Sequence, residues 1–136
     1  MKKILVIDGQ GGKLGAQLIR ALLSDFPELS VTAVGTNSIA TATMLKAGAE
    51  QAATGENAAM VCAGNADIIV GPIGILIADA MLGEITPRMA CAIAQSAAKK
   101  ILIPSNRCGS IVAGTSALTL SEMIEDAQKL LRKELE

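Results

Sequence analysis

The sequence contains no histidine, tyrosine or tryptophan, and phenylalanine occurs once, at Phe26. Without an imidazole or a phenol, general acid–base catalysis would depend on Asp, Glu, Lys and Cys side chains. A Ser-His-Asp triad and a histidine-containing zinc site are both excluded, and we expect no metal site. The near absence of aromatic rings also removes the stacking platforms on which proteins bind single-stranded nucleic acids.

The chain also lacks an excess of charge of either sign and a set of cysteines that could form a disulfide framework. Twelve basic and 13 acidic residues give a net charge of −1, so the chain lacks the basic surface of a nucleic-acid-binding protein, and we expect no such partner. The three cysteines have no C-x-x-C spacing, and their odd number argues against a disulfide framework. We expect Cys62 and Cys91 to be packed in the core.

Long apolar runs are missing as well. The longest, residues 68–78, is interrupted by two glycines and a proline and is far shorter than the roughly 20 residues of a membrane-spanning helix. Lys2 and Lys3 precede four apolar residues, too few for a signal peptide. Together with the unpaired cysteines, these features predict a cytoplasmic protein without a membrane partner.

Strand-like and helix-like segments alternate along the chain, which is typical of a parallel sheet covered by helices on both faces. With 51% hydrophobic residues and no linker or repeat, residues 1–136 are predicted to form a single Rossmann-like α/β domain. We expect three layers around a doubly wound, mostly parallel sheet. Strands are predicted over 3–8, 31–34, 50–54, 67–71, 99–104 and 110–113. Helices are predicted over 13–25, 39–48, around 60–61, over 75–82 and 86–98, and from 119, with N-caps at Ser38, Thr86 and Thr119.

The first predicted strand leads into a glycine-rich loop that opens the first helix. Gly9, Gly12 and Gly15 fit G-x-x-G-x-x-G, whereas Leu14 occupies the third glycine position of G-x-G-x-x-G. Unpaired N–H groups at a helix N-terminus attract phosphate, and glycine allows the ligand to approach closely. We therefore predict that the loop binds a nucleotide or a phosphorylated metabolite, and that Gly12→Val abolishes binding in a folded domain. The alternative is a structural turn without a ligand. The predicted binding residues are Gly9, Gln10, Gly11, Gly12, Lys13, Leu14 and Gly15.

Small and polar residues follow the other predicted strands as well. In a doubly wound sheet, ligands bind beyond the carboxyl ends of the strands at the point where the strand order reverses. Neutral hydrogen-bonding groups at this edge suit a small polar or phosphorylated ligand, although loops are polar in general. We expect the site to be completed by Thr36, Asn37 and Ser38 and by Gly71, Pro72 and Gly74.

Four residues are candidates for catalysis. Asp8 ends the first strand and could orient a hydroxyl group or a metal-bound water, although an aspartate here often anchors the turn instead. Lys13 follows the glycines, but Leu14 stands where a phosphate-binding P-loop has a hydroxyl, so a solvated lysine is the alternative. Glu56 follows a predicted strand. Cys108 lies beside an arginine, which could lower the pKa of its thiol, although most cysteines are inert packing residues and that is the alternative.

The glycine spacing resembles that of atypical short-chain dehydrogenases and related NAD(P)-binding proteins over the first forty or so residues. This resemblance implies NAD(P) as a cofactor. The catalytic Tyr-x-x-x-Lys pair of that family is excluded because the chain has no tyrosine, so we expect no short-chain dehydrogenase activity. Gly35-Thr36-Asn37 also replaces the acid that binds a ribose hydroxyl after the second strand.

A second resemblance extends along the whole chain, to a small uncharacterised bacterial family known as a domain of unknown function. This resemblance supports the fold and implies no assigned activity. The segments that carry it are Ile7-Asp8-Gly9-Gln10-Gly11-Gly12, residues 35–41, residues 52–57, Gly71-Pro72-Ile73-Gly74 and residues 78–87.

Three classes of function stay open: a binding module that senses a ligand, a small enzyme acting on a phosphorylated metabolite, and a structural subunit that has lost its ligand. Residues 75–82 are apolar on nearly all sides of the predicted helix, which favours an interface between two copies. We therefore expect a homodimer. Leu76→Glu or Met81→Glu would then give a folded monomer.

Overall fold

The computed structural model describes residues 1–104 and 109–136, and its centre is a parallel sheet. The strand order is β3-β2-β1-β4-β5. Strand β1 lies in the middle, where Ile4 pairs with Val31 on one side and with Ile68 on the other. The strands are β1 (Ile4–Asp8), β2 (Val31–Gly35), β3 (Gln51–Thr54), β4 (Ile68–Pro72) and β5 (Lys99–Ile103).

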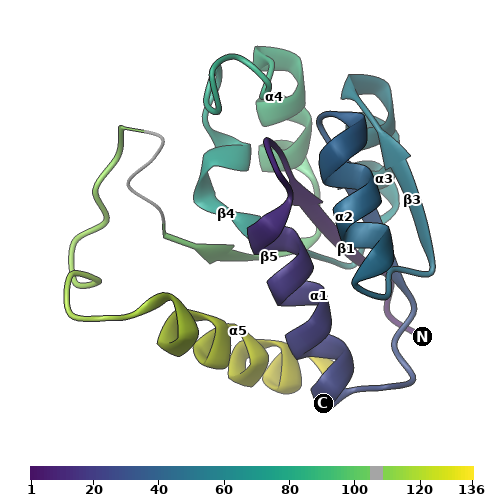
Figure 1. Ribbon diagram of the computed structural model, residues 1–136, viewed down its shortest axis with the longest axis vertical. Helices are drawn as coiled ribbons and strands as arrows, with labels where there is room; N and C mark the ends of the chain where they lie inside the picture. Colours follow the sequence, from purple (N-terminus) through teal and green to yellow (C-terminus); the bar gives the residue numbers. More distant parts are fainter. Residues whose placement is uncertain (105–108) are drawn as a thin grey trace.

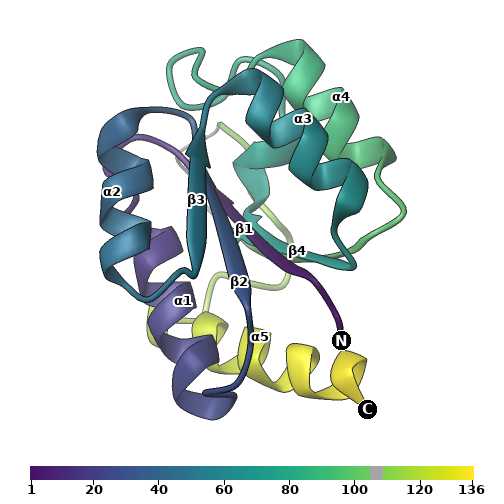
Figure 2. The same ribbon diagram turned by 90° about the vertical axis from the view of Figure 1, so that its right-hand side faces the viewer.

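Helices cover both faces of the sheet (Figures 1 and 2). One face packs against α1 (Lys13–Asp25), α2 (Ser38–Lys46) and α5 (Leu120–Leu135), and the other against α3 (Glu56–Asn65) and α4 (Pro87–Gln95). Alternate residues of β1 therefore enter two separate cores: Ile4 and Val6 face α1, and Leu5 and Ile7 face α3 and α4. The predicted doubly wound, three-layer α/β fold is confirmed.

The strand order reverses between β1 and β4. From β1 the chain winds outward through β2 to β3, and α3 then returns it to β4 on the other side of β1. In such sheets this switch point leaves a crevice beyond the carboxyl ends of the two strands. The crevice is bordered by the glycine loop after β1 and by the short 3₁₀ helix η1 (Ile73–Leu76) after β4.

Two of the three predicted N-caps, Thr86 and Thr119, are confirmed. Thr119 forms a capping box with Glu122 at the start of α5, and the Thr86 hydroxyl accepts a hydrogen bond from the Met89 N–H in α4. Helix α2 differs, because its N-cap is Asn37 and not Ser38. The Asn37 backbone is extended and its Oδ1 accepts a hydrogen bond from the Ala40 N–H at 2.9 Å, whereas Ser38 is already helical.

The predicted helix over residues 75–82 is wrong. After η1 the chain forms consecutive turns in which Asp79, Met81 and Leu82 have φ angles of 67°, 59° and 57°. These left-handed conformations cannot continue a right-handed helix. The apolar pattern instead reflects a folded turn that packs on the α3–α4 side of the sheet. The predicted strand at 110–113 is also absent, since no residue from 109 to 119 lies in a strand.

This correction removes the basis for the predicted dimer interface. Leu76 and Met81 are half-buried and pack against the α3–α4 core, so a glutamate at either position would place a charge in the fold. The large apolar side chain that is exposed in this segment is instead Leu82, at 97%.

Cys62 is half-buried as expected, but Cys91 is exposed on α4, contrary to prediction. Among the described residues, no helix has the length and apolar character needed to cross a membrane.

Candidate functional site

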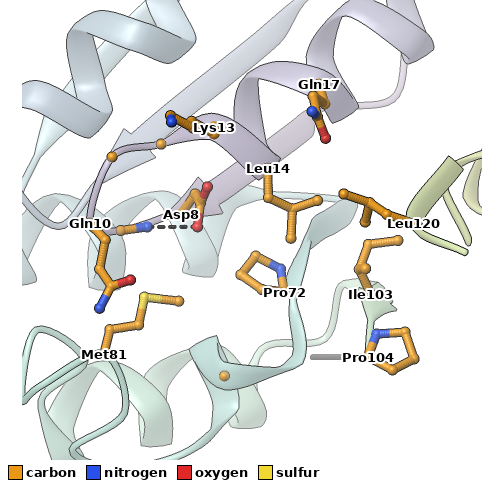
Figure 3. A pocket seen from close by; sticks show the side chains of 14 residues that line it. Asp8, Gln10, Lys13, Leu14, Gln17, Pro72, Met81, Ile103, Pro104 and Leu120 are labelled. Carbon is orange, nitrogen blue, oxygen red and sulfur yellow. Dashed lines mark hydrogen bonds between the residues drawn. The ribbon is translucent and has the colours of Figure 1, made fainter. Parts of the chain in front are cut away.

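A pocket of about 570 Å³ lies at the carboxyl ends of β1, β4 and β5, at the switch point. Figure 3 shows the glycine loop along one side and apolar side chains opposite it. Of the predicted site residues, those lining the pocket are Asp8, Gly9, Gln10, Gly11, Gly12, Lys13, Leu14, Pro72 and Gly74. The predicted residues Gly15, Thr36, Asn37, Ser38, Gly71 and Glu56 do not line it, and Gln17, Met81, Ile103, Pro104 and Leu120 were not predicted.

Asp8 holds the glycine loop in shape. It is buried, with 5% of its surface exposed, because it ends the central strand. Its Oδ1 accepts a hydrogen bond from the Gly9 N–H and its Oδ2 one from the Gly15 N–H, each at 2.8 Å. The carboxylate also lies at the N-terminus of α1, where the helix dipole stabilises a negative charge. This geometry agrees with the turn-anchoring alternative for Asp8.

Other residues of the loop carry backbone N–H groups without an acceptor among the described residues. The Gly12 N–H donates to the Gly9 carbonyl at 2.9 Å and closes the turn. The N–H groups of Gly11, Lys13 and Leu14 have no acceptor within residues 1–104 and 109–136, and all three residues line the pocket. Unpaired donors at the start of a helix form an anion-binding arrangement.

The loop glycines have different structural roles. Gly12 has a φ of 71°, and a Cβ atom there would lie 2.7 Å from the Cα of Ala40 in α2. Gly12→Val would therefore force α2 away from the loop, which contradicts the expectation of a folded variant. A Cβ at Gly15 would lie 2.6 Å from the Met44 sulfur, so Gly15 serves the packing of α1. At Gly11 the nearest atom is 3.9 Å away, so a side chain fits there.

Thr36 and Asn37 lie outside the pocket and donate hydrogen bonds to a carboxylate from the segment before α4. Glu84 Oε1 accepts hydrogen bonds from the Gln10 N–H at 2.8 Å, from Asn37 Nδ2 at 3.0 Å and from the Thr36 hydroxyl. Burial raises the pKa of Glu84, but the hydrogen bonds from Thr36, Gln10 and Asn37 outweigh this and lower the pKa below its ordinary value of 4.5. Sequence spacing gave no signal for this contact, which joins residues 47 positions apart.

The side of the pocket facing the glycine loop is apolar. Pro72, Ile103 and Leu120 lie there, Leu14 points toward them from the start of α1, and Gln10 and Met81 lie at the other end of the pocket (Figure 3). The pocket therefore combines a polar end, made of backbone N–H groups, with an apolar wall. Such a combination suits a ligand that has an anionic group attached to a flat or apolar body.

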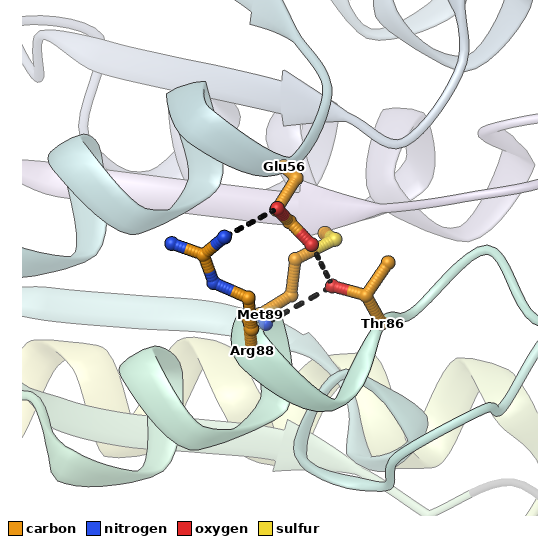
Figure 4. Close-up of polar contacts among 4 residues, drawn as sticks. All are labelled: Glu56, Thr86, Arg88 and Met89. Carbon is orange, nitrogen blue, oxygen red and sulfur yellow. Dashed lines mark hydrogen bonds and ion pairs between the residues drawn. The ribbon is translucent and has the colours of Figure 1, made fainter.

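The remaining catalytic candidates do not come together. Glu56 lies between the N-terminal ends of α3 and α4, where its Oε2 accepts a hydrogen bond from the Thr86 hydroxyl at 2.5 Å (Figure 4). Its Oε1 lies 3.8 Å from Arg88 Nη1, so the carboxylate links the two helices. Lys13 is exposed at the edge of the pocket. Cys108 lies outside the described residues.

A family model described as "Domain of unknown function (DUF3842)" matches residues 3–136. The chain belongs to this family. The chain-long resemblance to a domain of unknown function is thereby confirmed. The family description assigns no activity.

Among solved structures, the chain is similar to a dodecameric FMN-dependent UbiX-like decarboxylase from Escherichia coli O157:H7. The two are 18% identical, the match covers 99% of this chain and 94% of that chain, and the TM-score is 0.52. At this identity the likeness concerns the fold. A comparison with curated protein sequences gives no match.

Proposed function

We propose that the chain binds a nucleotide or another phosphorylated small metabolite in the switch-point pocket. The observation that carries this proposal is that the N–H groups of Gly11, Lys13 and Leu14, three residues that line the pocket, have no acceptor among the described residues. These donors would hold a phosphate group, and the positive end of the α1 dipole would stabilise its charge. The apolar wall would then receive a base, a flavin ring or another flat group.

Two observations bear on the kind of nucleotide. The similar solved structure is that of an FMN-dependent protein, which supports including flavin nucleotides among the candidates. NAD(P) stays a candidate through the glycine spacing alone. Neither observation bears on a reaction.

The geometry of Asp8 favours a sensing module over an enzyme. Asp8 is the carboxylate that lines the pocket, and both of its oxygens accept hydrogen bonds from the loop backbone. A general base needs an oxygen directed at its substrate. Turnover of a bound ligand would instead favour the enzyme alternative.

Homo-oligomer formation remains part of the proposal, now on a different basis. The similar solved structure is dodecameric, which supports an assembly of several copies. Static light scattering on the purified protein tests this, with the chain mass of 13.9 kDa as the value expected for a monomer.

A ligand screen tests the binding proposal. Because the chain has no tryptophan or tyrosine, nucleotide-like ultraviolet absorbance in the purified protein would directly report a retained ligand. Thermal shifts should be measured with FMN, NAD⁺, NADP⁺, AMP and inorganic phosphate. Gly11→Val, whose Cβ atom meets no close contact and which places a branched side chain at the loop, should weaken the shift. Gly64→Val, at an equally open glycine of α3 away from the pocket, should retain it. The absence of both a retained ligand and any shift would reject the proposal.

A further inference from the structure

The connection between η1 and α4 crosses the edge of the sheet. We call residues 77–85 the strap. It starts beyond the end of β4, contacts the loop after β1 through Gln10 and reaches Thr36 and Asn37 after β2. Because the strand order is β2-β1-β4, the strap passes over the end of β1 (Figure 2, top). It therefore covers the β1–β2 side of the switch point, where its Met81 lines one end of the pocket, and the rest of the pocket extends from the glycine loop toward β4 and β5.

The strap is a built element with a fixed shape. The Asp79 N–H donates to the Ile85 carbonyl at 2.7 Å, and the Ile85 N–H donates to the Ala80 carbonyl at 3.2 Å, so the segment closes on itself. Ala80 and Ile85 are buried in the α3–α4 core and anchor it. Both ends are thus attached to the fold, and Glu84 extends from this frame toward β2.

The strap fills the space next to the glycine loop on this side. A Cβ atom at Gly9 would lie 2.6 Å from the Met81 sulfur and 2.9 Å from Glu84 Oε1, which shows how closely the strap packs on the loop. Glu84 Oε1 also takes the hydrogen bonds of all three donors that face it after β1 and β2. A ligand that reached this side would meet a carboxylate and a closed backbone.

This placement matters for ligand size. A dinucleotide bound to a doubly wound sheet spans the crevice, with its phosphates on the glycine loop and one ribose beyond the second strand. We infer that the strap and Glu84 confine the ligand to the β4–β5 side, so that the site takes a mononucleotide or another compact phosphate ester and rejects dinucleotides. This inference rests on the proposed function and narrows its ligand class.

Matched ligand pairs test the inference by isothermal titration calorimetry. FAD contains FMN extended by an adenylate, and NAD⁺ extends nicotinamide mononucleotide in the same way. The wild type should bind at least one mononucleotide at least about tenfold more tightly than its dinucleotide. Glu84→Ala should reduce the ratio of mononucleotide affinity to dinucleotide affinity by about threefold or more. Glu84→Gln, whose amide oxygen can accept the same hydrogen bonds, should retain most of it, and so should Glu125→Ala on the exposed surface of α5.

The backbone amide signal of Gln10 in NMR spectra shows independently whether the hydrogen bond between the glycine loop and the strap is lost, because this N–H loses its acceptor in Glu84→Ala. If the wild type binds both members of a pair equally, the inference fails and the proposed function stands. The inference also fails if Glu84→Ala shifts the Gln10 amide but leaves the ratio unchanged. If the wild type binds no member of either pair and no compact phosphate ester, the proposed function fails and the inference with it.

Discussion

Replacing Asp8 by asparagine should destabilise the fold before it affects any chemistry. The carboxylate accepts hydrogen bonds from the Gly9 and Gly15 N–H groups with separate oxygens. An asparagine has one acceptor oxygen, so its NH₂ group would face one of the two donors. A hydrogen bond to a charged group contributes about 1.5–3 kcal/mol, and a buried donor left unpaired costs about 1–3 kcal/mol. We expect Asp8→Asn to lower the free energy of unfolding by about 2–4 kcal/mol.

Urea denaturation measures this change, and Asp67→Asn provides the matched control. Asp67 Oδ2 also accepts a backbone hydrogen bond, from the Lys3 N–H at 2.7 Å, but this contact is exposed to solvent. Its loss should cost less than about 1 kcal/mol, because water replaces the partner. If Asp8→Asn proves no less stable than Asp67→Asn, the hydrogen bonds of Asp8 do not hold the glycine loop in its conformation. Until stability is measured, a loss of activity in Asp8→Asn gives no evidence for catalysis.

Further predictions concern the loop, the strap and the thiols. Gly12→Ala should lose more than about 2 kcal/mol in urea denaturation because of its left-handed φ and the adjacent α2 backbone, whereas Gly11→Ala should stay within about 0.5 kcal/mol; equal losses would contradict the assignment of their roles. Although burial opposes it, hydrogen bonding lowers the folded-state pKa of Glu84. The contribution of the Glu84 carboxylate to the free energy of unfolding is therefore complete above pH 4.5 and is lost as the pH falls through the lower folded-state pKa. The stability difference between wild type and Glu84→Gln should shrink in that acidic range and not at alkaline pH. Burial raises the pKa of the Cys62 thiol, so iodoacetamide should modify exposed Cys91 first, as peptide mass spectrometry can establish; faster modification of Cys62 would mean that its side chain is more accessible than the structure indicates.

Elements with strong local signals could be predicted from the sequence. The bounds expected for the first helix, 13–25, are those of α1, because its apolar spacing and the glycine loop before it act within the same segment. The capping box at Thr119 and the proline at the start of α4 are local signals of the same kind. The buried run of β4 likewise indicated a strand covered on both faces.

The turns that follow η1 could not be predicted, because their conformation depends on distant partners. Residues 75–82 have a helix-like apolar pattern, yet Asp79, Met81 and Leu82 adopt left-handed angles. These conformations are unfavourable in isolation and persist here because buried residues and the Glu84 hydrogen bonds fix the strap at both ends. Rules based on the spacing of residues along the chain do not detect contacts between residues so far apart in the sequence.

The glycine motif shows a second limit of sequence reasoning. Gly11, Gly12 and Gly15 occupy neighbouring motif positions, but one borders open space, one lies against α2 and one packs against Met44. Spacing identifies the loop and cannot separate a glycine required by the fold from one that leaves room for a ligand. Which glycines the fold requires depends on their contacts with α2, a helix that comes after β2 in the chain.

The acid expected after the second strand illustrates how an absence in the sequence can be filled in three dimensions. Gly35-Thr36-Asn37 lacks that acid, and this absence alone argued against a dinucleotide. The structure nevertheless places a carboxylate there, that of Glu84, delivered by the strap from beyond β4. A carboxylate on β2 itself would be free to accept a ribose hydroxyl, whereas Glu84 arrives with the strap, whose Met81 and Glu84 side chains occupy the space beside Gly9. The sequence and the structure therefore give different physical arguments against a dinucleotide: the first is a missing acceptor, and the second is the proposed steric conflict between a dinucleotide and the strap that carries the acceptor.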